Sequence, residues 1–353
     1  MKKAIKIILI VLAVIVGLFA ALLIWLTVTQ LNVKTETAVV THGDNSTAAF
    51  APGDEVSILS WNIGYAGLGE ESDFFMDGGK QTRAPSKAIV EKNMDGIVAT
   101  VQSMAADFTF LQEIDAGPST HAYGIEEAGR MRTETQLDSA HALNYKCAFV
   151  PYPIPPIGRV NTGLMTLSTA PIASAERIAL PSPFKWPVSV ANLKRCLMPV
   201  YIDLEGTDAQ LVLVNLHLEA YDDGEGKAAQ TAALTSFLEQ EYAKGNYVIA
   251  GGDFNQTFPG VLDKYPIKND QLWTPGTLDD SMLPDGWHFA YDTAVPTCRL
   301  DNQPYDAESE ATQHYVIDGF ILSPNVELTG VQTQNDGFRF SDHNPVLLNI
   351  RLK

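Results

Sequence analysis

The sequence has little cysteine, since its 353 residues include only Cys147, Cys196 and Cys298, and no CxxC pair is present. So few cysteines, in an odd number, argue against a disulfide scaffold. A single disulfide among the three stays open for an exported protein, but three small residues packed in the interior are the simpler interpretation. A catalytic cysteine is not favoured, because no partner residue accompanies any of them.

Positive charge is also scarce. The chain has 24 Lys and Arg residues against 42 Asp and Glu residues, which gives a formal net charge of −18. Proteins that bind duplex nucleic acid usually present a basic face, so this composition argues against tight, non-specific nucleic-acid binding. It is compatible with a cleft that binds phosphate through a metal ion. The length permits a large core, and one large α/β domain fits as well as two smaller ones.

The N-terminus holds a long apolar run, from Ile7 to about Val28. About 22 residues suffice for one helical crossing of a bilayer, whereas the apolar part of a signal peptide is usually about 7–15 residues long. We therefore predict a transmembrane helix, with a cleaved signal peptide as the alternative. Lys2, Lys3 and Lys6 precede the run, which predicts a cytoplasmic N-terminus by the positive-inside rule.

The remainder of the chain is then predicted to lie outside the cytoplasm, held at the cell membrane by a single-pass anchor. Residues 1–30 would form the anchor with its short tail, residues 31–54 a polar stem, and residues 55–353 the folded domain. No partner protein is predicted.

The folded domain is predicted to contain more strands than helices. Helical periodicity predicts helices at 86–105 and 227–244, and the segments 114–140, 151–160, 181–193 and 256–312 are expected to be long loops of the kind that often carry function. Because strands come in adjacent groups as well as alternating with helices, we expect a sheet-on-sheet core with helices outside. Apolar runs predict strands at 56–62, 107–113, 145–150, 163–168, 196–204, 210–218, 247–254, 314–322, 326–333 and 345–352.

Six of these segments carry a polar or proton-handling residue beside an apolar run. They are Ser60-Trp61-Asn62, Leu111-Gln112-Glu113, Asn215-Leu216-His217-Leu218, Gly252-Asp253-Phe254-Asn255, Val316-Ile317-Asp318-Gly319 and Ser341-Asp342-His343. Strand ends can bring such carboxylates, amides and imidazoles together at one edge of a sheet. That edge would suit one divalent cation and one phosphate ester. The prediction of such a site depends on all six segments together. Each segment alone is explained more simply, for example as a turn or as an exposed loop residue.

Three of the candidate residues offer oxygen ligands for a metal ion. Glu113 provides a carboxylate of the kind that Mg²⁺ prefers, with Mn²⁺ as an alternative cation. Asn62 would offer its amide oxygen to the metal or its NH₂ group to a phosphate oxygen. Asp342 would bind the metal or a water molecule.

The remaining candidates would handle water, protons and phosphate. Asp253 follows a strand and two glycines, and would orient or deprotonate an attacking water that Asn255 helps to hold. His217 would donate a hydrogen bond to phosphate or act as an acid. His343 would serve as a base or an electrostatic clamp, and Asp318 would fix its tautomer.

Two arginines stand out in so acidic a chain. Arg195 and Arg299 would either contact phosphate or form structural salt bridges, and the residues themselves favour neither alternative.

Taken together and in this order, these segments resemble the endonuclease/exonuclease/phosphatase superfamily over about residues 55–353. Asn161-Thr162-Gly163 also resembles the family strand that carries an Asn-Gly or Tyr-Gly step, which makes Asn161 a candidate substrate contact. The resemblance implies an α/β (α+β) fold, a four-layer sandwich in which two mixed β-sheets pack face to face with flanking helices.

The resemblance also implies Mg²⁺-dependent hydrolysis of a phosphate ester by an in-line water. Which histidine would act as the acid stays open. On the matched positions the implied metal ligands are Asn62, Glu113 and Asp342, and the implied catalytic residues are His217, Asp253, Asn255, Asp318 and His343.

Three substrate classes stay open: nucleic acid, a phospholipid headgroup and a small phosphorylated metabolite. The apolar, proline-containing loops Phe149–Pro156 and Phe184–Pro187 would suit a lipid interface. A non-catalytic module that binds phosphate ligands is the alternative of another class. It is disfavoured because no candidate catalytic residue is missing.

Overall fold

Two large sheets form the centre of the molecule in the computed structural model, which describes residues 2–31, 36–222 and 224–353. The first sheet has the order β1 (Glu36–Thr37), β7 (Ser174–Ala179), β8 (Cys196–Asp203), β9 (Gln210–His217), β10 (Tyr247–Asp253), β16 (Asp318–Leu322) and β13 (His288–Ala290). The second has the order β17 (Val326–Thr333), β18 (Val346–Leu352), β3 (Glu55–Asn62), β4 (Phe108–Asp115), β6 (Gly158–Ser168), β5 (Asp138–Val150) and β2 (Val39–Thr41).

Short elements and helices complete the described part of the chain. Two small ribbons pair β11 (Gln256–Thr257) with β12 (Gly276–Thr277) and β14 (Cys298–Arg299) with β15 (His314–Tyr315). The α-helices are α1 (Lys2–Thr29), α2 (Lys87–Met104), α3 (Glu127–Thr135), α4 (Glu225–Ala243) and α5 (Val261–Lys264). The 3₁₀ turns are η1 (Gly64–Ala66), η2 (Phe75–Asp77), η3 (Val188–Ala191) and η4 (Asp280–Met282).

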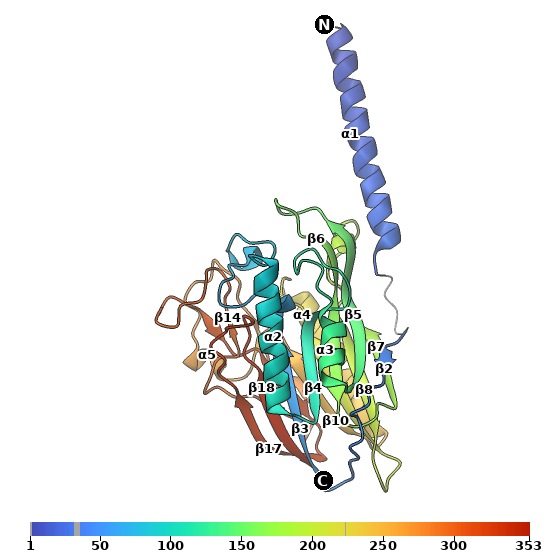
Figure 1. Ribbon diagram of the computed structural model, residues 1–353, viewed down its shortest axis with the longest axis vertical. Coiled ribbons are helices and arrows are strands. Elements are labelled where there is room, and N and C mark those ends of the chain that lie inside the picture. The colour runs from blue at the N-terminus through green and yellow to red at the C-terminus, as the bar shows by residue number, and fades with distance from the viewer. Residues whose placement is uncertain (1, 32–35, 223) are drawn as a thin grey trace.

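Three apolar clusters hold the layers together. The central cluster joins the inner faces of the two sheets, with Ile58 and Phe110 from one sheet and Leu213 and Phe320 from the other. A second cluster packs α2 and α3 on the outer face of the second sheet, and a third packs α4 on the outer face of the first. Both sheets are mixed, because β3 and β4 are parallel, as are β9 and β10, while the other strand pairs are antiparallel. The predicted four-layer sandwich is therefore confirmed (Figure 1).

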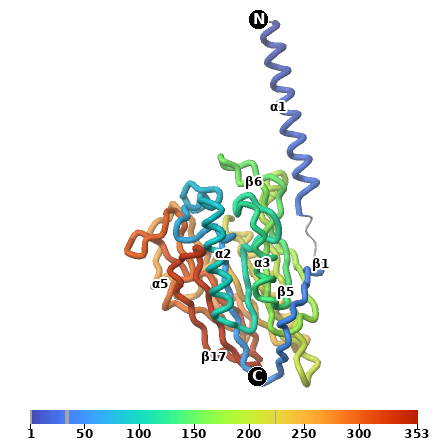
Figure 2. Tube along the Cα trace, in the orientation of Figure 1, coloured from blue at the N-terminus to red at the C-terminus, as the bar shows by residue number. Residues whose placement is uncertain are grey.

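The helix α1 projects from one end of the sandwich, and the C-terminus lies at the opposite end (Figure 1). Figure 2 shows that the tip of the β5–β6 hairpin lies at the same end as α1. By length and composition α1 could cross a membrane, and a signal sequence would have the same properties. Its last turns contact the domain, since Leu26 is buried against β5 and η3.

Part of the segment predicted as a stem belongs to the sheets instead. β1 pairs with β7 and β2 pairs with β5, one at the edge of each sheet. The reason is that Ala38 and Phe50 are apolar and enter the central core. Met1 of the predicted anchor and residues 32–35 of the predicted stem lie outside the described residues.

Several other elements were not predicted, since the expected loop 256–312 contains the short elements β11, β12, α5, β13 and β14. The strand β7 has a weak apolar pattern because Arg177 occupies an inward position, where its Nε and Nη2 donate to the carbonyls of Leu143 and Lys194 at 2.7 and 2.8 Å. The segment 114–140 was expected to be a loop, but it contains α3 and the start of β5. The sequence gives little helical signal here because α3 is mostly polar and buries only Glu127, Ala128 and Met131. The three cysteines are buried and free.

Candidate active site

The ends of several central strands meet at one edge of the sandwich. In the first sheet β10 lies between β9 and β16, and Asp253 is paired with His217 on one side and with Asp318 on the other. In the second sheet the parallel strands β3 and β4 pair Asn62 with Gln112. Strand register therefore brings together residues that are far apart in the sequence, as the sequence analysis predicted.

The segment before β18 is attached to the end of β3. The indole Nε1 of Trp61 donates to the carbonyl of His343 at 2.9 Å. The hydroxyl of Ser341 donates to the carbonyl of Asn62 at 2.8 Å. These two hydrogen bonds hold Asp342 and His343 over the edge where the other candidates lie.

Glu113 reaches this edge through a β-bulge. Its φ is 53°, in the left-handed region, and the register of β4 against β6 shifts between Gln112 and Ile114. In a regular strand Glu113 would lie on the face opposite Gln112, whose Nε2 donates to Asn215 Oδ1 at 2.8 Å between the sheets. The bulge redirects the Glu113 side chain towards the strand ends, a use of bulges that recurs next to active sites.

Glycine lets β10 approach β9 closely just before Asp253. Gly252 has a φ of 143°, and a Cβ atom there would lie 2.0 Å from the carbonyl oxygen of Leu216. A larger residue at this position would displace one of the two strands. The glycine therefore positions Asp253 beside His217.

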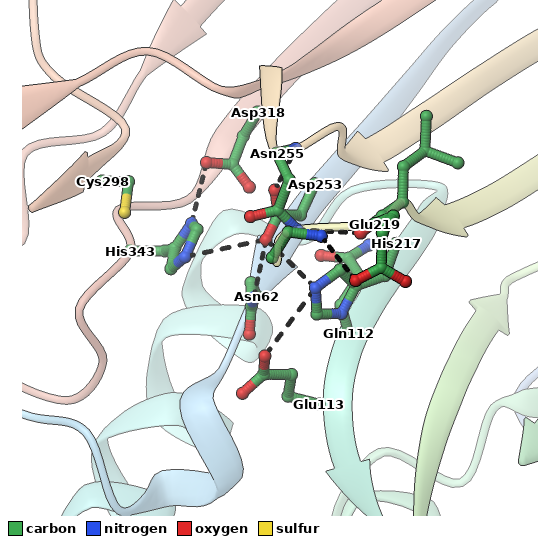
Figure 3. Close-up of polar contacts among 12 residues, drawn as sticks. Asn62, Gln112, Glu113, His217, Glu219, Asp253, Asn255, Cys298, Asp318 and His343 are labelled. Carbon is green, nitrogen blue, oxygen red and sulfur yellow. Dashed lines mark hydrogen bonds and ion pairs between the residues drawn. The ribbon is translucent and has the colours of Figure 1, made fainter. Parts of the chain in front are cut away.

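The Asp253 carboxylate is the centre of the polar network (Figure 3). Its Oδ2 accepts a hydrogen bond from Asn62 Nδ2 at 3.0 Å, and its Oδ1 accepts one from the backbone N–H of Asn255 at 2.8 Å. The Nε2 atoms of His217 and His343 lie 3.4 and 3.8 Å from Oδ2. One oxygen of Asp253 thus lies between two imidazole rings.

The two histidines have opposite charge preferences. Burial opposes a charge on His343, but the neighbouring Asp318 and Cys298 outweigh it and raise the pKa of His343 well above its ordinary value. Asp318 Oδ2 lies 2.8 Å from His343 Nδ1. Burial, together with the nearby Arg195 and His343, lowers the pKa of His217 well below its ordinary value. These shifts favour the cationic imidazole at His343 and the neutral one at His217.

The carboxylates at this edge repel one another. Burial raises the pKa of Glu113 to about 8, and the nearby Asp342 and Asp253 raise it further than His343 and Arg195 lower it. Burial likewise raises the pKa of Asp342. Buried acids that repel one another would be stabilised by a cation, and carboxylate and amide oxygens are the donors that Mg²⁺ prefers. The residues present therefore fit a divalent metal.

A group of ligand atoms other than the predicted metal set also lies close together. One atom from each of Asp253, Asp318 and His343 falls within 4.8 Å of the others. This clustering does not require a metal, because the imidazole of His343 lies between the carboxylates of Asp318 and Asp253 and can interact with both. Glu113 and Asp342 are held less tightly: an oxygen of Glu113 lies 3.8 Å from His217 Nε2, and Asp342 accepts a hydrogen bond from the Ser341 hydroxyl at 3.2 Å.

The predicted substrate contacts separate in the structure. Arg195 is buried at this edge, where its Nε lies 3.9 Å from Glu219 and Nη1 donates to the carbonyl of His217 at 3.4 Å. Arg299 forms a structural salt bridge instead, with Nη1 2.8 Å from Asp301 and Nη2 donating to the carbonyl of Gly69 at 2.8 Å. Asn161 is not brought to the edge, because it lies along β6, where its backbone N–H donates to Ser119.

Two residues at the site escaped the sequence analysis. Tyr65 lies three residues after Asn62 in a left-handed turn with φ 54°, and burial, followed by the charge of Glu113, raises the pKa of its hydroxyl. Glu219 is buried beside Arg195. The only sequence signal for a role of Glu219 was its position two residues after His217. The apolar pattern of β9 has already ended at that position.

A cavity of about 640 Å³ opens above this edge. Its floor, a name used below for the polar edge, consists of Asn62, Glu113, His217, Asp253, Asn255, Asp342 and His343. Its walls are largely apolar and come from loops and from α1, with Leu23, Phe75, Val150, Ile157, Val188 and Leu193 among them. The floor can hold a metal and a phosphate ester, and the walls can hold an apolar group.

Comparisons with known proteins agree with this geometry. The sequence profile of the Endonuclease/Exonuclease/phosphatase family matches residues 59–343. No curated protein sequence matches the chain.

The fold is similar to several solved structures. An endonuclease/exonuclease/phosphatase from Beutenbergia cavernae is 18% identical, with a TM-score of 0.58 over 84% of this chain and 72% of that chain. The human Nocturnin catalytic domain with bound sulfate anion is 15% identical, with a TM-score of 0.52 over 87% of this chain and 97% of that one. D. rerio TDP2 complexed with single strand DNA product is 15% identical, with a TM-score of 0.51 over 84% and 99%.

Proposed function

The chain belongs to the endonuclease/exonuclease/phosphatase family, and from this premise we propose that it is a metal-dependent phosphoesterase. It would hydrolyse a phosphate ester by in-line attack of water. The observation that carries the proposal is the polar network around Asp253, in which an amide, two imidazoles and a second carboxylate converge at the floor of one cavity.

Glu113, Asn62 and Asp342 would hold the metal, with Mg²⁺ as the preferred cation and Mn²⁺ as the alternative. The buried, mutually repelling carboxylates of Glu113 and Asp342 support this assignment. When bound, the ion would supply Lewis-acid stabilisation of the charge on the phosphoryl oxygens.

Asp253 would orient the attacking water and take its proton. Its two oxygens are already fixed by Asn62 and by the backbone of Asn255, which leaves the carboxylate in one orientation. The Asn255 side chain donates to the carbonyl of Leu218 at 2.9 Å, so we propose that it positions the turn and turns towards phosphate only when substrate is bound.

His343 would donate a proton or a hydrogen bond to the phosphoryl group or the leaving oxygen. Its contact with Asp318 favours the cationic imidazole and leaves Nε2 directed towards Asp253. His217, being neutral, would donate a hydrogen bond to a phosphate oxygen, and Arg195 behind it would add positive charge at the floor. This assigns the acid to His343, the choice that the sequence left open.

We further propose that α1 stays attached as a single-pass anchor and that residues 55–353 form the catalytic domain outside the cytoplasm. The packing of Leu26 against the domain supports a retained helix. The three lysines before the apolar run support a cytoplasmic N-terminus.

The test is hydrolysis of bis-p-nitrophenyl phosphate by the full chain in detergent, with Mg²⁺ and with chelator. We expect Mg²⁺-dependent release of p-nitrophenol, and a loss of at least about 10²-fold in Asp253→Asn. Asp208→Asn, a matched change at an exposed loop position, should leave the rate unaltered. Binding of Mg²⁺ without turnover would favour the non-catalytic module, and full activity in Asp253→Asn would remove this residue from the mechanism.

A further inference from the structure

The end of α1 forms part of the mouth of the active-site cavity. Leu23 and Leu26 line the same cavity whose floor holds Asp253. Leu26 packs in one apolar cluster with Tyr145 and Val150 of β5. The helix therefore meets the domain at the opening that a substrate must pass.

The length of α1 sets the level of this opening relative to a bilayer. The helix has 28 residues, whereas about 20 suffice to cross the hydrocarbon core. The last two turns, which carry Leu23 and Leu26, would then lie at the lipid–water interface. Trp25 in the same turns is a residue type enriched at that interface.

Exposed apolar side chains lie on two segments that line the same cavity. We call Tyr152, Ile154, Trp186 and Val188 the apolar rim. Their exposed fractions are 72%, 94%, 62% and 58%, respectively. In the described part of the chain outside α1, all four are among the five most exposed large apolar side chains. Tyr152 and Ile154 lie at the tip of the β5–β6 hairpin, at the same end of the sandwich as α1 (Figure 2).

The rim is joined directly to the helix. Trp186 Nε1 donates to Thr27 Oγ1 at 3.1 Å, and η3, which contains Val188, contacts α1. A water-soluble substrate would require no exposed apolar surface at this place, and large exposed apolar patches commonly mark membrane or protein interaction sites. Because the rim lies next to the proposed membrane anchor, a membrane fits this exposed surface better than a partner protein does.

The walls of the cavity continue this apolar surface inward to the floor. Val150, Ile157 and Leu193 line the same cavity as the polar floor. A substrate that fits has an apolar part along the walls and a phosphate ester at the floor. The net charge of −18 and the apolar walls both oppose a nucleic-acid strand in this cavity.

From these observations we propose that the substrate is a membrane phospholipid, which enters from the bilayer between α1 and the apolar rim. This inference rests on the proposed phosphoesterase function and names its substrate class. The oxygen of water forms a bond to phosphorus, and one phosphorus–oxygen ester bond breaks. The released alcohol keeps the ester oxygen and takes up a proton, and the other product retains the phosphate.

The test places the full chain in nanodiscs that contain phosphatidylcholine, phosphatidylethanolamine, phosphatidylglycerol and sphingomyelin, with Mg²⁺ present. Mass spectrometry follows the loss of each lipid. The same headgroups on short-chain analogues, held below their micelle-forming concentration, provide the soluble arm. We expect at least one long-chain lipid to be cleaved about tenfold faster or more than its soluble analogue.

Variants of the rim separate lipid entry from chemistry. Ile154→Ser and Trp186→Ala change exposed side chains that do not line the cavity. We expect each to slow cleavage of the nanodisc lipid by about tenfold while leaving hydrolysis of bis-p-nitrophenyl phosphate unchanged. Leu328→Ser on β17, at the end of the molecule away from α1, is the control and should alter neither rate (Figure 1).

The outcomes distinguish the inference from the function on which it rests. Hydrolysis of bis-p-nitrophenyl phosphate without loss of any nanodisc lipid would overturn the lipid inference and leave the phosphoesterase standing. Cleavage of a single-stranded DNA oligomer in place of lipid would overturn it in favour of nucleic acid. Silence towards every substrate would contradict both.

Discussion

The floor and the rim belong to one cavity but are built from different kinds of structure. The floor lies at the ends of central strands, where pairing on both sides fixes residues such as Asp253 within the sheet. The rim lies in a hairpin tip and in the segment around η3, where Ile154 and Trp186 are 94% and 62% exposed. The proposed chemistry needs fixed geometry, and its residues lie on the paired strands of the floor. The proposed contact with a membrane needs no fixed geometry, and its residues lie on the loops of the rim.

The comparison also separates two kinds of effect. A change at the floor should impair the hydrolysis of every substrate, because it acts on the reacting phosphate. A change at the rim should impair only substrates that reside in the membrane.

The largest effect is expected from His343→Gln. Removing the imidazolium that Asp318 stabilises takes away the proposed acid, so turnover should fall by about 10²–10⁴-fold for soluble and lipid substrates alike. His288→Gln on the edge strand β13 is the matched control and should retain activity. A variant of His343 that fails only on lipid would contradict the division between floor and rim.

A smaller and more specific effect is expected from Glu113→Gln. The amide keeps the volume of the side chain but removes the charge proposed to bind the metal. The Mg²⁺ concentration for half-maximal activity should rise by about tenfold or more, as losing one charged ligand weakens such sites. Glu91→Gln, at an exposed position of α2, is the control. An unchanged Mg²⁺ titration would remove Glu113 from the metal site.

The smallest effect is expected at Asp77, which lines the same cavity. Burial raises the pKa of this carboxyl to about 7, while its backbone hydrogen bond from Asp301 and the charge of Arg299 act in the opposite direction. Between the ordinary pKa of about 4 and this value, the folded protein keeps a proton that the unfolded chain has lost. The free energy of unfolding should therefore fall as pH rises from about 4 to about 7.

Asp77→Asn should remove this part of the pH dependence, which amounts to a few kcal/mol at about 1.4 kcal/mol per pKa unit. Urea unfolding at pH values across that window would measure it. Equal slopes in the variant and the parent protein would show that Asp77 is ionised in the folded state. Hydrolysis of the soluble ester at pH 8 should be little changed in either case.

The strand ends that make the floor could be predicted because each follows a continuous apolar run. Val248 and Ile249 mark β10, and the glycines before Asp253 mark its close approach to β9. Buried strands of this kind carry their signal in residues that are adjacent in the sequence. The order of the six motifs then predicted the family and the four-layer fold, and both are confirmed.

Other features depend on contacts between distant residues and could not be predicted. The bulge at Glu113 arises from a register shift against β6, and the inward Arg177 hides the pattern of β7 behind hydrogen bonds to two distant carbonyls. The engagement of Arg299 depended in part on the distant carbonyl of Gly69, to which its Nη2 donates at 2.8 Å. The position of α1 at the cavity mouth depends on packing against β5, for which the apolar run of the helix holds no signal.

The most direct test of the central claim follows the oxygen of water. Hydrolysis of bis-p-nitrophenyl phosphate by the full chain, with Mg²⁺ in water enriched in the heavy oxygen isotope, would be analysed by mass spectrometry of both products. The account predicts that the label appears in the phosphate-containing product and not in p-nitrophenol, and that chelator abolishes the reaction. Label in p-nitrophenol, or an equal rate in the presence of chelator, would contradict metal-dependent attack of water at phosphorus.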